Sequence, residues 1–151
     1  MFNSKLYFYS LFTALAAIIL IAAGGLVTST GSGLSVPDWP LSYGQFFPPM
    51  IGGIRYEHSH RVIAALVGFL TFFLSAWLWR AEKRRFMKIL ALSASAAILI
   101  QAVLGGMTVK LLLPKPVSVS HACLGQSFFV LLCLVSLFLS KSWVLGTQAV
   151  A

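Results

Sequence analysis

The fold is decided by residues 62–88, which read VIAALVGFLTFFLSAWLW followed by RAEKRRFMK. The first eighteen residues carry no charge, and the nine that follow hold five of the eleven Lys and Arg residues of the chain. A charge-free apolar run of this length can cross the hydrocarbon core of a bilayer as one helix. A dense basic segment at its end is typical of the cytoplasmic side. This stretch therefore predicts a membrane-spanning helix that ends in the cytoplasm.

The composition of the whole chain also indicates a membrane protein. Of its 151 residues, 59% are hydrophobic and only 9% are charged, whereas a soluble domain has about 25% charged residues. Disorder is excluded because it requires low hydrophobicity. The net charge of +8 is divided among segments that flank the apolar runs and does not form one face. No nucleic-acid partner is therefore expected.

Three further stretches without Asp, Glu, Lys or Arg are long enough to span a bilayer. We predict an all-α fold, a polytopic membrane four-helix bundle that forms a single transmembrane domain over residues 1–151. By the positive-inside rule both termini are expected in the cytoplasm, in a cell (inner) membrane, and no cleaved signal peptide is expected. The predicted spans are about 6–28, 58–79, 88–109 and 118–140, with an outer loop at 29–57.

A weak internal repeat divides the predicted bundle into two related helical hairpins. Gly24-Gly25 and Gly105-Gly106 lie near the ends of the first and third spans, and His60 and His121 lie near the starts of the second and fourth. Glycine pairs permit close helix packing, which alone would explain them. Their register with two histidines places both imidazoles at similar depth toward the outer face. Ionisable residues in a membrane usually face the bundle interior, so this pattern predicts a shared ligand.

A porphyrin iron is the ligand that we favour for His60 and His121. Four-helix bundles hold cofactors between facing helices, and imidazole is a common axial ligand of haem iron. Zinc would need about four ligands, and His58 and Cys123 could complete that set by residue type alone. However, His58 and His60 lie about 200° apart around a helix, so no zinc is expected. We interpret His58 as an interface residue.

Three charged residues near His60 are further candidates for the site. Glu57 lies one helical turn before His60, where it could transfer protons, orient the imidazole or cap the helix. Arg61 and Arg55 could pair with haem propionates or extend toward the lipid headgroups. The outer loop is rich in Gly, Pro and aromatic residues, which predicts a compact lid over the bundle.

Together, these residues closely resemble the heme A synthase family. The resemblance covers nearly all of this chain, which corresponds to one four-helix half of the usual two-part member. The matching elements are Gly24-Gly25-Leu26-Val27, the loop segments TGSGLS at 30–35 and PDWP at 37–40, Glu57, His60-Arg61, the segment 101–106 and His121.

The resemblance implies a membrane oxidoreductase of heme A biosynthesis, which oxidises the C8 methyl group of heme O to a formyl group for terminal oxidases. It further implies that His60 and His121 are axial ligands of haem b or heme O, and that Glu57 acts in catalysis. Heme O is then the substrate. An electron donor, a heme O synthase and a respiratory complex are candidate partners.

Two differences from the family affect this interpretation. The cysteine pair often found in the outer loop is replaced by Val36 and Ser42, and the chain has one histidine pair where family members have two. The single pair predicts a homo-oligomer, with a dimer favoured, that restores the second half by symmetry. One haem that loses a ligand during turnover would also explain a single pair. The alternative functions are a b-type bis-histidine haem subunit that transfers electrons within a respiratory complex, and a structural subunit with a vestigial site.

Overall fold

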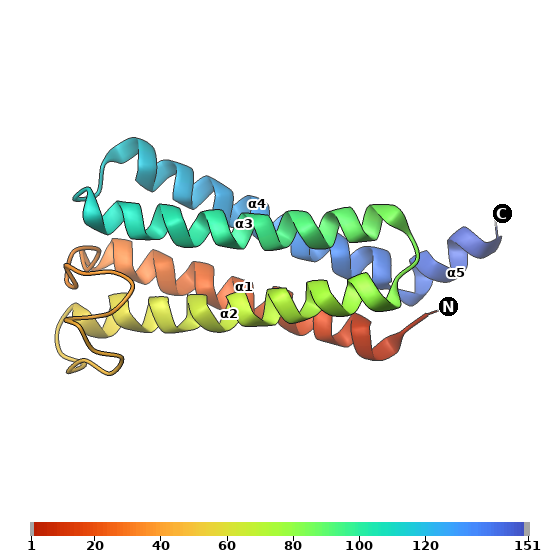
Figure 1. Cartoon of the computed structure of the whole chain (residues 1–151), viewed down its shortest axis with the longest axis horizontal. Helices are drawn as coiled ribbons and strands as arrows, with labels where there is room; N and C mark the ends of the chain where they lie inside the picture. Colours follow the sequence, from red (N-terminus) through yellow and green to blue (C-terminus); the bar gives the residue numbers. More distant parts are fainter. Residues whose placement is uncertain (1, 150–151) are drawn as a thin grey trace.

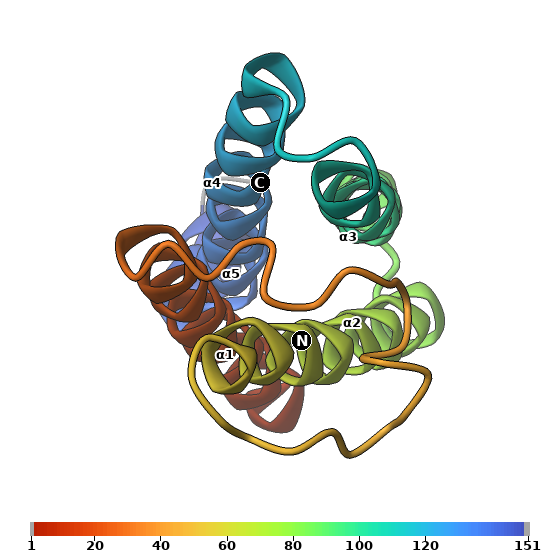
Figure 2. The same cartoon turned by 90° about the vertical axis from the view of Figure 1, so that its left-hand side faces the viewer.

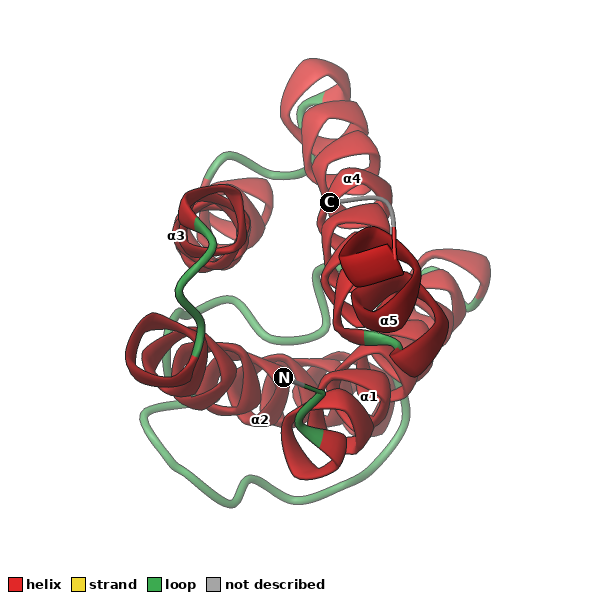
Figure 3. Cartoon of the chain, turned by 90° about the vertical axis from the view of Figure 1, so that its right-hand side faces the viewer, coloured by secondary structure: helices red, strands yellow, loops and turns green. Residues whose placement is uncertain are grey.

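The computed structural model describes residues 2–149, which form helices, loops and turns but no strand (Figure 3). Four long helices run alternately up and down, and a short fifth helix follows the fourth (Figure 1). This arrangement confirms the predicted all-α four-helix bundle. The helices are α1 (Ser4–Ser29), α2 (Ile54–Ala81), α3 (Arg85–Lys110), α4 (Lys115–Leu139) and α5 (Lys141–Ala149).

The helix boundaries differ from the predicted spans. α2 begins at Ile54 rather than at 58, α3 at Arg85 rather than at 88, and α4 at Lys115 rather than at 118. The predictions stopped at charged residues, but a helix can continue into the headgroup region, where long basic side chains reach water. α5 has only nine residues and therefore carries too weak a pattern to be recognised in the sequence.

All four long helices are long and apolar enough to cross a membrane. Their most apolar windows have mean hydropathies of 2.0 to 2.4, yet only 22 to 28% of the residues in those windows are buried. Most of this apolar surface therefore faces outward, as lipid-facing helices require. The chain is a multi-pass membrane protein.

The helices pack as two hairpins placed side by side. α1 packs on α2 and α3 on α4, and the hairpins meet where α2 contacts α3 and α1 contacts α4. α2 and α4 are consequently diagonal to each other across the bundle (Figure 2). These are the helices that carry the two histidines.

The buried apolar core lies in the half of the bundle nearest the chain termini. Its fully buried members lie within residues 6–17, 67–78, 87–98 and 128–139. The opposite end carries the loop 30–53 and the turn 111–114, and we call it the loop end. The helical segments at the loop end contribute no buried residue to this core within the described part of the chain. Polar residues are concentrated there instead.

Candidate functional site

His60 and His121 occupy matching positions at the loop end. Each is the seventh residue of its helix, and so lies in the second turn rather than the first. Each ring packs on the glycine at position twenty-one of the preceding 26-residue helix. A Cβ built on Gly24 would lie 3.1 Å from His60 Cε1, and one built on Gly105 would lie 3.2 Å from His121 Cε1. The repeat recognised in the sequence is therefore also a repeat of side-chain packing.

The surroundings of the two rings follow the same plan. The backbone carbonyl of Leu20 faces His60 and that of Gln101 faces His121, each one turn before the glycine. The second glycines of the two pairs, Gly25 and Gly106, differ in their surroundings. A Cβ on Gly25 would meet nothing within 4 Å, whereas one on Gly106 would meet the Trp39 ring.

Both imidazoles keep a buried nitrogen, Nδ1, without a hydrogen-bond partner. Among the described residues, Gln101 Oε1 and Ser118 Oγ are also buried without a hydrogen-bond partner. A buried polar atom left unpaired costs about 1–3 kcal/mol. Since Nδ1 of each ring is buried against the neighbouring helix, Nε2 is the nitrogen left to face a group held between the diagonally opposed helices, above a core that does not extend to this level. The donor set therefore suits haem iron.

Glu57 is buried, with 3% of its surface exposed, and its carboxylate connects α2 to the loop. Oε2 accepts a hydrogen bond from the Val36 N–H at 2.9 Å, and Oε1 accepts one from Arg61 Nη2 at 2.5 Å. The residue before α2 is Gly53, and no side chain caps the helix there. Glu57 thus anchors the loop instead of capping the helix.

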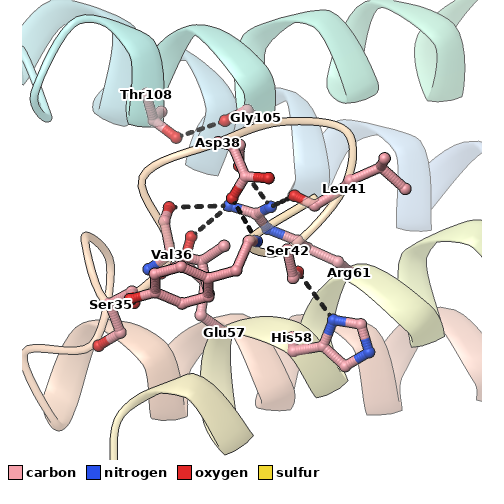
Figure 4. Close-up of polar contacts among 11 residues, drawn as sticks. Ser35, Val36, Asp38, Leu41, Ser42, Glu57, His58, Arg61, Gly105 and Thr108 are labelled. Carbon is pink, nitrogen blue, oxygen red and sulfur yellow. Dashed lines mark hydrogen bonds and ion pairs between the residues drawn. The ribbon is translucent and has the colours of Figure 1, made fainter. Parts of the chain in front are cut away.

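Arg61 is the centre of the polar network at the loop end (Figure 4). Its Nη1 donates to the carbonyl oxygens of Asp38 at 2.7 Å and Leu41 at 2.8 Å. Its Nη2 donates to Glu57 and to the Val36 carbonyl oxygen at 3.2 Å. The guanidinium therefore binds the loop and does not extend toward lipid headgroups.

Arg55 lies outside this network. Its guanidinium is exposed, stacks 4.7 Å from the centre of the Tyr56 ring and donates to the Tyr56 hydroxyl at 3.0 Å. The structure therefore brings Glu57 and Arg61 together, but it leaves Arg55 apart from them. The predicted pairing of either arginine with a propionate stays a prediction.

The loop is compact, which confirms the predicted lid. The Asp38 carboxylate accepts the Tyr43 and Gly44 N–H groups, both at 2.7 Å. The Gly44 N–H is the main reason that the pKa of Asp38 lies below its ordinary value; burial opposes this, and the Tyr43 N–H and Arg61 add to it. The Trp39 ring lies 2.8 Å from where a Cβ on Gly106 would be. The loop therefore crosses from one hairpin to the other (Figure 2).

His58 also holds the loop. It is 9% exposed, and its Nδ1 shares a hydrogen bond of 2.9 Å with Ser42 Oγ. Val36 and Ser42, which replace the cysteines often found in the resembling family, are thus both hydrogen bonded to α2. In the described part of the chain no three His, Cys, Asp or Glu residues form a group that could hold a metal ion. His58 and Cys123 therefore do not form a metal-binding group with His60 and His121.

Sequence reasoning did not identify the roles of two residues of the site, Ser118 and Ser42. Ser118 stands three residues before His121, as Glu57 stands three before His60, so comparison of the two repeats could have found it. Ser42 carries no local signal, because its contact with His58 depends on the path of the loop.

The fold and the site define a class of protein: a multi-pass membrane protein whose four-helix bundle encloses a symmetric pair of histidines. The family model of COX15-CtaA, the cytochrome oxidase assembly proteins, matches residues 7–52 and 54–149. The chain belongs to this family.

Curated relatives agree with this assignment. The heme A synthases of Alkalihalophilus pseudofirmus and an Exiguobacterium species are each 37% identical to the chain over 107 residues, which is 68% of this chain and 36% and 35% of those proteins. The heme A synthase of Geobacillus kaustophilus is 36% identical over 100 residues, or 64% of this chain and 32% of that protein. The match therefore spans about a third of the length of these relatives. No solved structure matches the chain.

Proposed function

We propose that this protein acts as a heme A synthase-type oxidoreductase, which oxidises the C8 methyl group of heme O to a formyl group and so provides heme A for terminal oxidases. One observation carries the proposal: His60 and His121 pack on Gly24 and Gly105 at equal positions in two hairpins, with a buried carboxylate one turn before His60. The relatives named heme A synthase support the choice of substrate.

In this proposal, His60 and His121 hold the iron of haem b or of the substrate heme O. When bound, the porphyrin iron supplies the redox chemistry with oxygen. The glycines let each imidazole approach its neighbouring helix and fix its orientation. Glu57, held by the Val36 N–H and by Arg61, offers a carboxylate that accepts and returns protons close to His60.

The two arginines have different parts in this proposal. The four terminal N–H groups of Arg61 match its four contacts with Glu57 and the loop carbonyls, so Nε–H is its one donor without a partner among the described residues. Arg61 is therefore a positioning residue for Glu57 and the loop, with Nε–H its only donor for a propionate. The exposed guanidinium of Arg55 is the freer candidate for that pairing.

We further propose a cell-membrane protein with both termini in the cytoplasm and the haem site toward the outer face. The basic residues at 80–88 lie at the end of the bundle opposite the loop, which supports this orientation. A homodimer would bring two histidine pairs into one assembly. Native mass spectrometry of the detergent-solubilised protein tests it, and a monomer at all concentrations would contradict it.

Pigment extraction tests the proposed function. The protein is purified from cells that make heme O, and its haems are separated by chromatography. Heme O and heme A beside haem b support the proposal. Haem b alone would contradict it and favour the b-type electron-transfer subunit, whereas absence of any haem would contradict both.

Glu57→Gln tests the catalytic carboxylate. The variant is expected to retain haem but to lose heme A formation, because an amide cannot accept the proton. Glu82→Gln is the matched control, since Glu82 pairs with Arg84 at 2.6 Å in the turn between α2 and α3, at the opposite end of the bundle. Unchanged heme A levels in Glu57→Gln would remove Glu57 from catalysis.

A further inference from the structure

A pocket of about 370 Å³ lies between the loop and α2. Its walls include Phe47, Pro48 and Met50 from the loop and His58, Val62 and Ile63 from α2. The loop passes along the side of α2 that faces away from the bundle (Figure 2). Val62 and Met50 are about half exposed, at 54% and 47%, so the pocket opens sideways onto the lipid-facing surface. Its volume is near the lower limit for small-molecule sites and suits a single substituted ring.

His58 gives this apolar pocket a fixed polar point. Ser42 Oγ holds the ring through Nδ1, whereas Nε2 has no hydrogen-bond partner among the described residues. Nε2 is not buried, and because His58 lines the pocket, a ligand in the pocket can reach this nitrogen. Figure 4 shows the Ser42 contact on one side of the imidazole and the second nitrogen on the other. Because Ser42 can donate or accept, Nε2 can accept or donate in return.

We propose that this pocket binds the ring of a lipid-soluble quinol, with a ring hydroxyl hydrogen bonded to His58 Nε2. No Lys or Arg lines the pocket, so it offers no counter-charge to a lipid phosphate. The apolar tail would leave along the outward face of α2, where Val62, Leu66 and Phe69 are 54%, 55% and 75% exposed. A quinol combines these two features, a small hydrogen-bonding ring and a long apolar tail.

The inference rests on the proposed function, which requires a source of electrons. In each oxygen insertion, one atom of O2 enters a C–H bond and the other leaves as water, which consumes two electrons and two protons. One quinol supplies two electrons and two protons and becomes a quinone. Its two protons are released to the solvent at the loop end, and two protons are taken up from solvent at the haem site. A haem held by His60 and His121 would accept these electrons. His58 and His60 lie on opposite faces of α2, so about one helix width of 10–12 Å separates the pocket from the haem site.

Direct binding of a quinone tests the pocket without the reaction. Radiolabelled decylubiquinone is titrated against the full-length protein in phosphatidylcholine nanodiscs. His58→Leu should weaken binding about tenfold or more, because one hydrogen bond to a fixed partner is lost. Val62→Trp should fill the pocket and abolish binding. Leu92→Trp is the matched control, since Leu92 is similarly exposed, at 63%, but lies on α3 and lines neither the pocket nor the proposed path of the tail, and it should bind normally.

The outcomes separate the two proposals. Absence of saturable binding in the wild type, or equal binding in all variants, would overturn the quinol site. Ser42→Ala keeps Nε2 and should retain binding; a loss as large as in His58→Leu would mean that the histidine acts only by holding the loop. In haem-loaded protein, His58→Leu should slow reduction by decylubiquinol but leave reduction by dithionite unchanged. Quinone binding by a protein that takes up no haem would sustain this site while the proposed function fails.

Discussion

Substitution of Gly24 by alanine should displace the His60 ring, whereas the same change at Gly25 should not. The new Cβ on Gly24 would lie 3.1 Å from His60 Cε1, and carbon atoms pack best at about 3.5–4.0 Å. The ring must therefore move by about 0.4 Å or more, and such overpacking typically costs about 1–3 kcal/mol. A Cβ on Gly25 meets nothing within 4 Å. Alanine there should stabilise α1 by about 0.5–1 kcal/mol, because glycine is a poor helix former.

Haem titration of the purified protein measures this difference. A cost of 1–3 kcal/mol corresponds to about 5- to 150-fold weaker haem binding in Gly24→Ala, with an altered low-spin spectrum. Gly25→Ala should bind haem like the wild type. Gly105→Ala should repeat the loss on the His121 side, where the corresponding distance is 3.2 Å. Equal haem affinity and equal spectra in Gly24→Ala and Gly25→Ala would refute the role assigned to the glycine.

Two further predictions concern the loop. Arg61→Gln leaves the buried Glu57 carboxylate without its cation, at a cost of about 3–5 kcal/mol, so proteolysis within residues 36–41 should become much faster. Arg55→Gln should leave it unchanged, and equal protection of both variants would contradict the anchoring role. The pKa of Asp38 is lowered mainly by the Gly44 N–H, so its contribution to stability is present above the unfolded pKa of about 3.9 and is lost as pH falls through the folded value. Hydrogen exchange of the Gly44 amide, corrected for its intrinsic rate, should therefore accelerate below about pH 4 in the wild type but show no such step in Asp38→Asn. A step that persists in Asp38→Asn would assign it to another group.

The helices could be predicted from the sequence because lipid imposes one strong constraint. A run without charges that is long enough to cross the bilayer has no stable alternative to a helix. The ends were less certain, since Arg85 and Lys115 are charged yet helical. Charge marks the hydrocarbon boundary, but the helix stops only where the backbone turns.

The histidine pair was predictable for a related reason. In both hairpins the glycine is the twenty-first residue of the first helix and the histidine is the seventh residue of the second, and equal positions in paired helices give equal geometry, although the connecting loops differ in length. The hydrogen bonds of Arg61 were not predictable, because they join α2 to carbonyls 20 to 25 residues earlier in the chain. Their existence depends on the path of the loop, which no local pattern encodes.

The departures from the repeat give the two sides of the site different chemistry. On the first hairpin the position three residues before the histidine is Glu57, and the position after the histidine is Arg61; on the second these positions are Ser118 and Ala122. The His60 side therefore has a fixed carboxylate whose hydrogen bonds are made within the protein. At the equivalent positions the His121 side has neutral residues, and the Ser118 hydroxyl has no hydrogen-bond partner among the described residues. In the proposed function, the repeat would provide two equivalent ligands, and its local loss would place the proton-transferring carboxylate beside His60 alone.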